Sequence, residues 1–130
     1  MKIKIFEAVE MGKLLEKLSK MPIDVQISYK FAKISLSLKS DIDFYQNQYI
    51  KYLKEFGLQN EEGFILNEQK NIKIIPGKEE ECRNNFSKLN SIEIEIPDIY
   101  FTLDELKGLK FSISDMKILT PFIKEPLRGE

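Results

Sequence analysis

Apolar side chains recur along residues 27–56 at the spacing of one helix face. These positions are Ile27, Phe31, Ile34, Leu38, Ile42, Tyr45, Tyr49, Tyr52 and Phe56. Their mean spacing is about 3.6 residues, the period of an α-helix. A helix of roughly 30 residues is about 45 Å long, more than the diameter of a small domain. The pattern therefore predicts a long helix within residues 23–58, which needs an extended surface of the chain itself or of a partner to lie against.

The residues that flank this segment indicate where the helix begins and ends. Asp24 is a suitable N-cap after the helix-breaking Pro22. Residues 23–31 also alternate as a strand would, but the helical period continues to Phe56, so we predict helix and allow only residues 23–25 to be extended. Gly57 is expected in the left-handed conformation that ends many helices.

The segment that precedes the long helix predicts a short strand and a second helix. Residues 2–6 alternate and are consistent with a strand, whereas residues 7–20 place apolar side chains on one helix face. These side chains are Met11, Leu14, Leu15 and Leu18. We expect this helix to pack antiparallel to the long one.

Short alternating segments in the middle of the chain predict a small antiparallel sheet. Residues 64–66 and 72–75 flank a five-residue loop, 67–71, as in a hairpin. Residues 78–89 can form a helix with Phe86 and Leu89 turned inward, and residues 91–96 alternate most clearly. We predict one sheet from residues 63–67, 71–75 and 91–96, to which residues 2–6 could add an edge strand.

Two capping boxes predict short helices near the C-terminus. Thr102 and Glu105 form the first, and Ser112 and Asp115 form the second, which ends before Pro121. The expected fold is therefore α+β: a long central helix with an antiparallel helical partner, a small antiparallel sheet and two short C-terminal helices. We treat residues 1–130 as one domain made of the segments 1–22, 23–58, 59–98 and 99–125.

Composition limits the chemistry that this domain can perform. The chain has 130 residues and contains no histidine, which excludes Ser-His-Asp and Cys-His catalysis and leaves a structural zinc site without its usual ligands. The six glycines are scattered and form no phosphate-binding loop. Cys82 follows three glutamates and is expected to be a buried or idle thiol. We therefore expect a protein that is not an enzyme and that holds no cofactor or metal.

Acidic residues are concentrated in the middle of a chain whose net charge is −1. Residues 59–106 contain 11 acidic and 5 basic side chains. The candidate acidic surface is Glu79, Glu80, Glu93, Glu95 and Asp98. A divalent-cation site, a hydrolytic pair of carboxylates and a mimic of nucleic-acid phosphates are the functional interpretations. The favoured interpretation is a solvated outer face of a strand together with a charged helix start.

Aromatic residues crowd the second half of the long helix. Tyr45, Tyr49, Tyr52 and Phe56 either pack within the chain, which we favour, or form a candidate partner interface. The lysines of this helix are balanced by aspartates and a glutamate, so nucleic-acid binding is unlikely. No apolar run approaches the roughly 18 residues that a membrane span requires, so no membrane association is expected.

Two stretches of the chain resemble a known family. They are Met21-Pro22-Ile23-Asp24-Val25 followed by residues 28–33, and residues 103–106 followed by Gly108-Leu109-Lys110-Phe111-Ser112, Asp115, Leu119 and Pro121-Phe122-Ile123. In this order, around a long helix, they resemble an uncharacterised family of small proteins encoded by bacteriophages and prophages of low-GC Gram-positive bacteria. The resemblance implies a phage-encoded protein in the host cytoplasm and carries over no catalytic residue.

Together these features favour a non-enzymatic interaction protein. Its partner is expected to be a phage structural protein, a host protein or a second copy of the chain. The alternative is an inhibitor of a bacterial defence system, such as an RNA-guided nuclease, that uses its acidic segment to occupy a nucleic-acid site. A metal-dependent hydrolase that uses Glu93, Glu95 and Asp98 is the third hypothesis.

Overall fold

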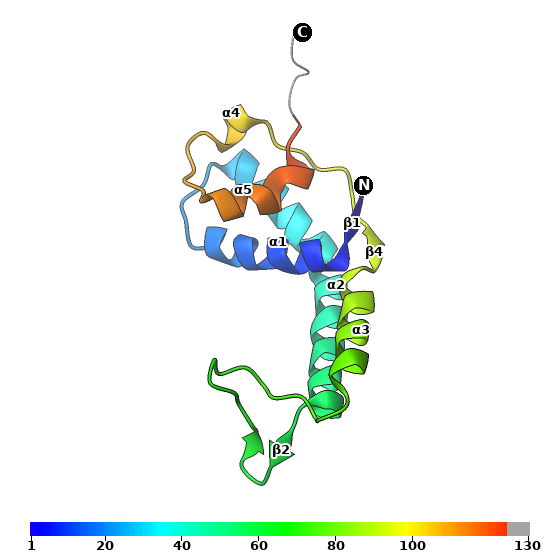
Figure 1. Ribbon diagram of the computed structural model, residues 1–130. Coiled ribbons are helices and arrows are strands. Elements are labelled where there is room, and N and C mark those ends of the chain that lie inside the picture. Colours follow the sequence, from blue (N-terminus) through cyan, green and yellow to red (C-terminus); the bar gives the residue numbers. More distant parts are fainter. Residues whose placement is uncertain (125–130) are drawn as a thin grey trace.

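The long helix α2, Val25–Phe56, forms the axis of the molecule (Figure 1). The computed structural model describes residues 1–124, and the segment 125–130 lies outside the described residues. Shorter helices and two small antiparallel sheets make up the rest of the described chain, which confirms the predicted α+β organisation. None of the described helices combines the length and the apolar character that crossing a membrane would require.

The start of α2 is as predicted, but its end is not. The Asp24 carboxylate accepts a hydrogen bond of 3.1 Å from the Gln26 backbone N–H, as an N-cap does. Gly57 is extended (φ −75°, ψ 134°), so the predicted left-handed conformation is wrong. The chain instead continues directly into an antiparallel bridge between Gly57 and Ile74. Glycine is needed because a Cβ there would lie 2.5 Å from the Leu53 carbonyl oxygen and 2.7 Å from the Phe64 ring.

The first half of α2 is covered by helix α1, Ile5–Leu18, and by Phe101, which stacks on Phe31, whereas the C-terminal helix at residues 113–119 packs on α1. The two long helices run antiparallel and approach closely at Gly12, where an added Cβ would lie 2.7 Å from the Ile42 side chain. Helices α4, Leu103–Leu106, and α5, Ile113–Leu119, begin with the two predicted capping boxes. The 3-10 helix η1, Thr120–Phe122, then places Phe122 in the core.

Helix α1 begins two residues before the predicted start. The reason is local, because the Glu7 carboxylate accepts a 3.0 Å hydrogen bond from the Lys4 backbone N–H and closes the first turn there. The strand that precedes it is consequently shorter than the predicted 2–6. Helix α1 buries six side chains, which include the four predicted from the sequence: Ile5, Ala8, Met11, Leu14, Leu15 and Leu18.

The second half of α2 is covered by helix α3, Glu79–Asn90, which runs back along it (Figure 1). Cys82 and Leu89 of α3 are buried, and Phe86 is partly buried. At about 1.5 Å per residue, α3 returns the chain by about 18 Å toward the N-terminus. This return decides where the following strand lies.

The strands form two separate sheets, so the predicted single sheet is wrong. Strand β4, Glu93–Glu95, pairs antiparallel with β1, Lys2–Lys4, and Ile3 faces Ile94 in the register. Strands β2, Gln59–Asn60, and β3, Gly63–Phe64, form a hairpin at the opposite end of α2. Because α3 separates the two regions, residues 91–96 cannot reach the hairpin.

The predicted loop at residues 67–71 is present, although the segments on either side form only an isolated bridge. Leu66 and Ile72 make this antiparallel bridge. The Asn67 side chain accepts hydrogen bonds of 2.9 and 3.0 Å from the backbone N–H groups of Gln69 and Asn71. The loop is therefore held by its own asparagine and not by an extended ladder.

The close packing at Gly57 predicts a stability difference between two glycines. We expect Gly57→Ala to lower the free energy of unfolding by about 1–3 kcal/mol, since its methyl group meets backbone and a ring. Gly108→Ala is the matched control, because an added Cβ meets nothing within 4 Å there. Urea unfolding measures both, and equal stabilities of the two variants would contradict the packing described here.

Candidate functional site

The four aromatic residues proposed as a partner interface pack mainly against α3. Tyr45 and Phe56 are buried, and the Tyr45 hydroxyl donates a 2.7 Å hydrogen bond to the Asn90 side chain. The rings of Tyr49 and Tyr52 lie 5.1 and 5.2 Å from the ring of Phe86, in edge-to-face contact.

This packing decides which aromatic side chains a partner could reach. Burial also raises the pKa of Tyr45, so its hydroxyl remains a donor. Tyr49, which is 42% exposed, keeps the largest accessible surface of the four residues. Tyr45 and Phe56 are therefore buried within the chain itself and offer no surface for a partner to contact.

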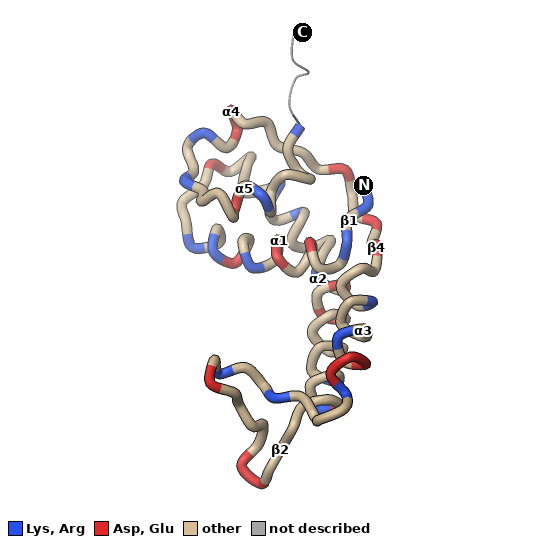
Figure 2. The backbone as a smooth tube through the Cα atoms, in the orientation of Figure 1, with Lys and Arg blue, Asp and Glu red and all other residues tan. Residues whose placement is uncertain are grey.

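The five acidic candidates do not form one surface. Glu79 and Glu80 begin α3, whereas Glu93 and Glu95 lie on β4 beyond its other end (Figure 2). The length of α3 separates the two groups by about 18 Å. Asp98 and Glu95 lie 2.5 and 3.5 Å from the Met1 ammonium, and these contacts raise the pKa of that ammonium.

Metal-ligating side chains and the single cysteine are the other groups that could carry chemistry. Within residues 1–124 no group of three or more histidine, cysteine, aspartate or glutamate side chains is arranged to hold a metal ion. Cys82 is buried, and burial raises the pKa of its thiol and favours the neutral form.

A second set of apolar side chains lies on the side of α2 that faces away from the core. Val25, Tyr29, Leu36 and Ile50 are 77%, 64%, 76% and 50% exposed. Tyr29, Leu36 and Ile50 are separated by multiples of seven residues, which keeps them on one helix face. The spacing is visible in the sequence, but the stronger stripe of buried residues obscured it. These four side chains are called the outer row.

The N-terminal part of the outer row borders an open groove of about 710 Å³. The groove lies between the start of α2 and the extended segment 98–100. We call it the α2 groove, and its lining residues are Val25, Gln26, Tyr29, Lys30, Lys33, Asp98, Ile99 and Tyr100. Sequence reasoning missed it because three of its eight lining residues come from a segment without periodic pattern, about 70 residues away along the chain.

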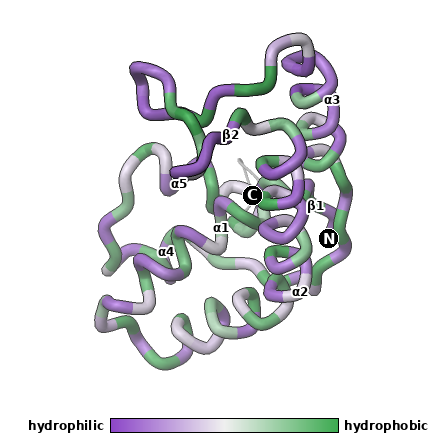
Figure 3. The backbone as a smooth tube through the Cα atoms, turned by 90° about the horizontal axis from the view of Figure 1, so that it is seen from below, coloured by the Kyte–Doolittle hydropathy of each residue, from purple (hydrophilic) through white to green (hydrophobic). Residues whose placement is uncertain are grey.

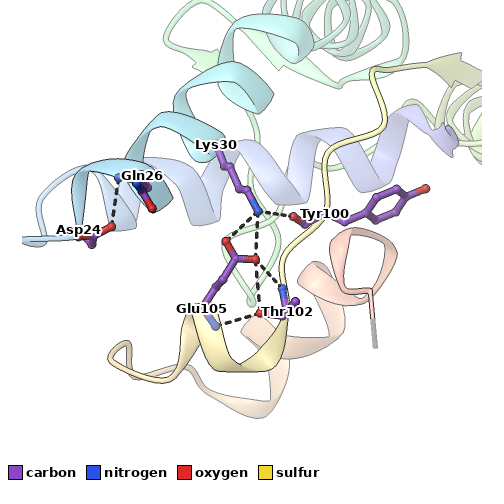
Figure 4. A network of polar contacts seen from close by, with 6 residues as sticks. All are labelled: Asp24, Gln26, Lys30, Tyr100, Thr102 and Glu105. Carbon is purple, nitrogen blue, oxygen red and sulfur yellow. Dashed lines mark hydrogen bonds and ion pairs between the residues drawn. The ribbon is translucent and has the colours of Figure 1, made fainter. Parts of the chain in front are cut away.

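Lys30 holds the second wall of the α2 groove, segment 98–100, in place (Figure 4). Its ammonium donates hydrogen bonds of 2.9 Å to the Tyr100 carbonyl oxygen and of 3.0 and 2.8 Å to the Glu105 carboxylate. Glu105 also closes the α4 capping box with Thr102. The Lys30 contact, followed by the Thr102 backbone N–H, lowers the pKa of Glu105. Lys30 therefore holds segment 98–100 in place, and its charge is compensated.

Lys33 lines the groove without such compensation, and Lys124 lies outside the lining but next to Tyr100. The Lys33 ammonium lies 5.5 Å from the centre of the Tyr29 ring, and the Lys124 ammonium lies 5.7 Å from that of Tyr100. In the part of the chain that the structure describes, neither has a carboxylate within ion-pair distance. The groove thus combines apolar and aromatic surface with positive charge, which suits binding of an apolar group next to an acidic one.

Comparisons with protein-family models, with curated proteins and with solved structures found no match to this chain. The geometry of the described residues is therefore the basis of the functional argument that follows.

The contact between α2 and α3 predicts a measurable hydrogen-bond energy. We expect Tyr45→Phe to lower the free energy of unfolding by about 1 kcal/mol, because it leaves the Asn90 side chain without its donor. Tyr49→Phe removes a hydroxyl from the neighbouring half-exposed ring and should change stability by less than about 0.5 kcal/mol. Equal losses for the two variants in urea unfolding would show that the Tyr45 hydroxyl makes no specific contribution.

The lowered pKa of Glu105 predicts how its contribution depends on pH. A carboxylate whose pKa falls on folding stabilises the protein above its ordinary pKa of about 4.3, and this stabilisation is lost as pH falls through the folded value. We expect Glu105→Gln to cost about 0.5–1 kcal/mol at pH 7, with the difference from the unmodified protein narrowing toward pH 3. Unfolding at a series of pH values measures this difference, and Glu68→Gln, in an exposed loop, is the control. A difference that grows as pH falls would contradict the assignment.

Proposed function

We propose that the protein is a non-enzymatic interaction protein that binds another protein through the α2 groove and the adjoining outer row. The observation that carries this proposal is the exposure of Val25, Tyr29 and Leu36 beside an open groove. Apolar surface that borders a groove in this way commonly marks an interaction site. Covering these side chains releases about 25 cal/mol for each Å² of apolar area removed from water.

The residues available for catalysis support binding as the function. The sequence contains no histidine, and the single cysteine is buried with a raised thiol pKa. Asp98, the carboxylate that lines the groove, is engaged by the Met1 ammonium. The remaining groove residues offer apolar, aromatic, amide and ammonium groups, which are contacts for recognition.

The resemblance to phage-encoded proteins supplies a setting for this proposal. In that setting the protein acts in the cytoplasm of an infected bacterium and binds a virion-assembly protein or a host factor. The alternative, an inhibitor that presents Glu79, Glu80, Glu93 and Glu95 to a nucleic-acid site, gains no support from the geometry because these residues lie in two separate groups.

Affinity capture with surface variants tests the proposed function. The tagged protein is used to capture partners from a Gram-positive host, the captured protein is identified by mass spectrometry, and both are purified to measure the dissociation constant. We expect Tyr29→Ser and Leu36→Ser to weaken binding by about tenfold or more, as for anchor residues of an interface.

Ile113→Ser on α5 is the matched control, because Ile113 is 80% exposed and lies outside the groove and the outer row. It should bind like the unmodified protein. A partner that tolerates both α2 substitutions, or that is lost equally with Ile113→Ser, would contradict the proposed surface. Light scattering of the purified protein shows whether the partner is a second copy.

A further inference from the structure

The α2 groove has a chemistry that specifies the kind of segment it binds. We propose that it accepts an extended peptide segment of the partner that carries an apolar side chain next to acidic residues. This inference rests on the proposed function and narrows it from a surface to a class of ligand.

The preference for an apolar side chain comes from the two walls of the groove. Val25 and Tyr29 project from α2, and Ile99 and Tyr100 come from the facing segment. Tyr29 is 64% exposed, whereas Ile99 and Tyr100 are partly buried. The helix side of the groove is therefore accessible to a ligand, and the facing side is partly shielded from solvent. An aliphatic or aromatic side chain inserted there would be in contact with both walls and would exclude water from them.

The preference for acidic residues in the ligand comes from the balance of charge around the groove. Lys30 is paired with Glu105, and Asp98 is paired with the Met1 ammonium, so both of these charges are compensated. Lys33, which lines the groove, and Lys124, which lies against the groove residue Tyr100, have no carboxylate partner among the described residues, so the uncompensated charge here is positive. Each lies over a tyrosine ring, so a carboxylate on the ligand would meet an ammonium beside the apolar contact.

The extended form of the ligand follows from the backbone of segment 98–100. This segment is neither helix nor strand, and among residues 1–124 the backbone N–H groups of Asp98, Ile99 and Tyr100 donate to no backbone acceptor. The next residue, Phe101, is already paired with η1 through a 2.7 Å hydrogen bond to the Phe122 carbonyl oxygen. These three N–H groups of a segment that lines the groove are therefore without backbone partners, and an extended peptide binds such groups through its main-chain carbonyls.

Single-stranded nucleic acid is the competing class of ligand, because bases stack on tyrosine and phosphates pair with lysine. The observations favour a peptide. Two uncompensated lysines provide little of the basic track that a phosphate backbone needs, and the chain has a net charge of −1.

Selection from a random peptide library against the complete, immobilised protein tests the inference. The enriched peptide is synthesised with a fluorescein label and titrated by anisotropy. We expect enriched sequences to combine Leu, Ile or Phe with neighbouring Asp or Glu. We expect Lys33→Glu and Tyr29→Ser to weaken binding of that peptide by about tenfold or more.

Lys39→Glu is the matched control, because it makes the same change of charge at an exposed position of α2 outside the groove. It should alter affinity by less than about twofold, and circular dichroism of each variant confirms folding. Basic enriched sequences, the absence of any enrichment, or equal effects of Lys33→Glu and Lys39→Glu would overturn the inference. Binding of a fluorescein-labelled oligo-dT strand that depends on Lys33 would also overturn it, in favour of nucleic acid.

The peptide specificity and the proposed function can fail separately. If no acidic–apolar peptide binds but the captured partner still depends on Tyr29 and Leu36, the inference fails and the proposed function stands. If the captured partner binds the Tyr29→Ser and Leu36→Ser variants as it binds the unmodified protein, the proposed function fails. Self-association that depends on Tyr29 and Lys33 would make a second copy the occupant and would overturn the peptide assignment.

Discussion

Burial of the apolar stripe of α2 along its whole length is the constraint on which the rest of the structure depends. A helix of 32 residues is about 48 Å long, and no other helix among the described residues approaches this length. Two shorter helices therefore cover it in succession, α1 over the first half and α3 over the second (Figure 1). Figure 3 shows the same arrangement from below, with hydrophobic and hydrophilic positions interspersed along each helix. The positions of the strands and the C-terminal helices follow from this division.

The C-terminal helices are attached by carboxylates that perform two tasks each. Glu105 and Asp115 close the capping boxes of α4 and α5, and they also pair with Lys30 and Lys17 at 2.8 and 2.9 Å. The side chain that closes the first turn of each helix is thereby also the contact that orients this helix, α4 against α2 and α5 against α1. The stacking of Phe31 on Phe101, with ring centres 4.4 Å apart, completes the attachment from the apolar side. The second wall of the α2 groove owes its position to these contacts.

Sequence reasoning succeeded where the cause is local. The helical period, the Asp24 cap and both capping boxes depend on residues a few positions apart, and each is present. It failed where distant segments compete for the same partner, since the strand around Ile94 could pair with the hairpin or with residues 2–6, and only the return path of α3 decides between them. The α2 groove was not predictable for the same reason. The outer row that begins beside it carries a readable heptad spacing, but segment 98–100 carries no pattern that places it opposite Tyr29.

The pairing of β1 with β4 also has a consequence for the order of folding. It joins residues 2–4 to residues 93–95, so it closes a loop of about 90 residues, whereas α1 and α2 meet across a short turn. Loop closure over such a separation costs entropy that is recovered only when the intervening helices are already packed. We therefore expect β1 to pair with β4 late in folding, after the helical core has largely formed.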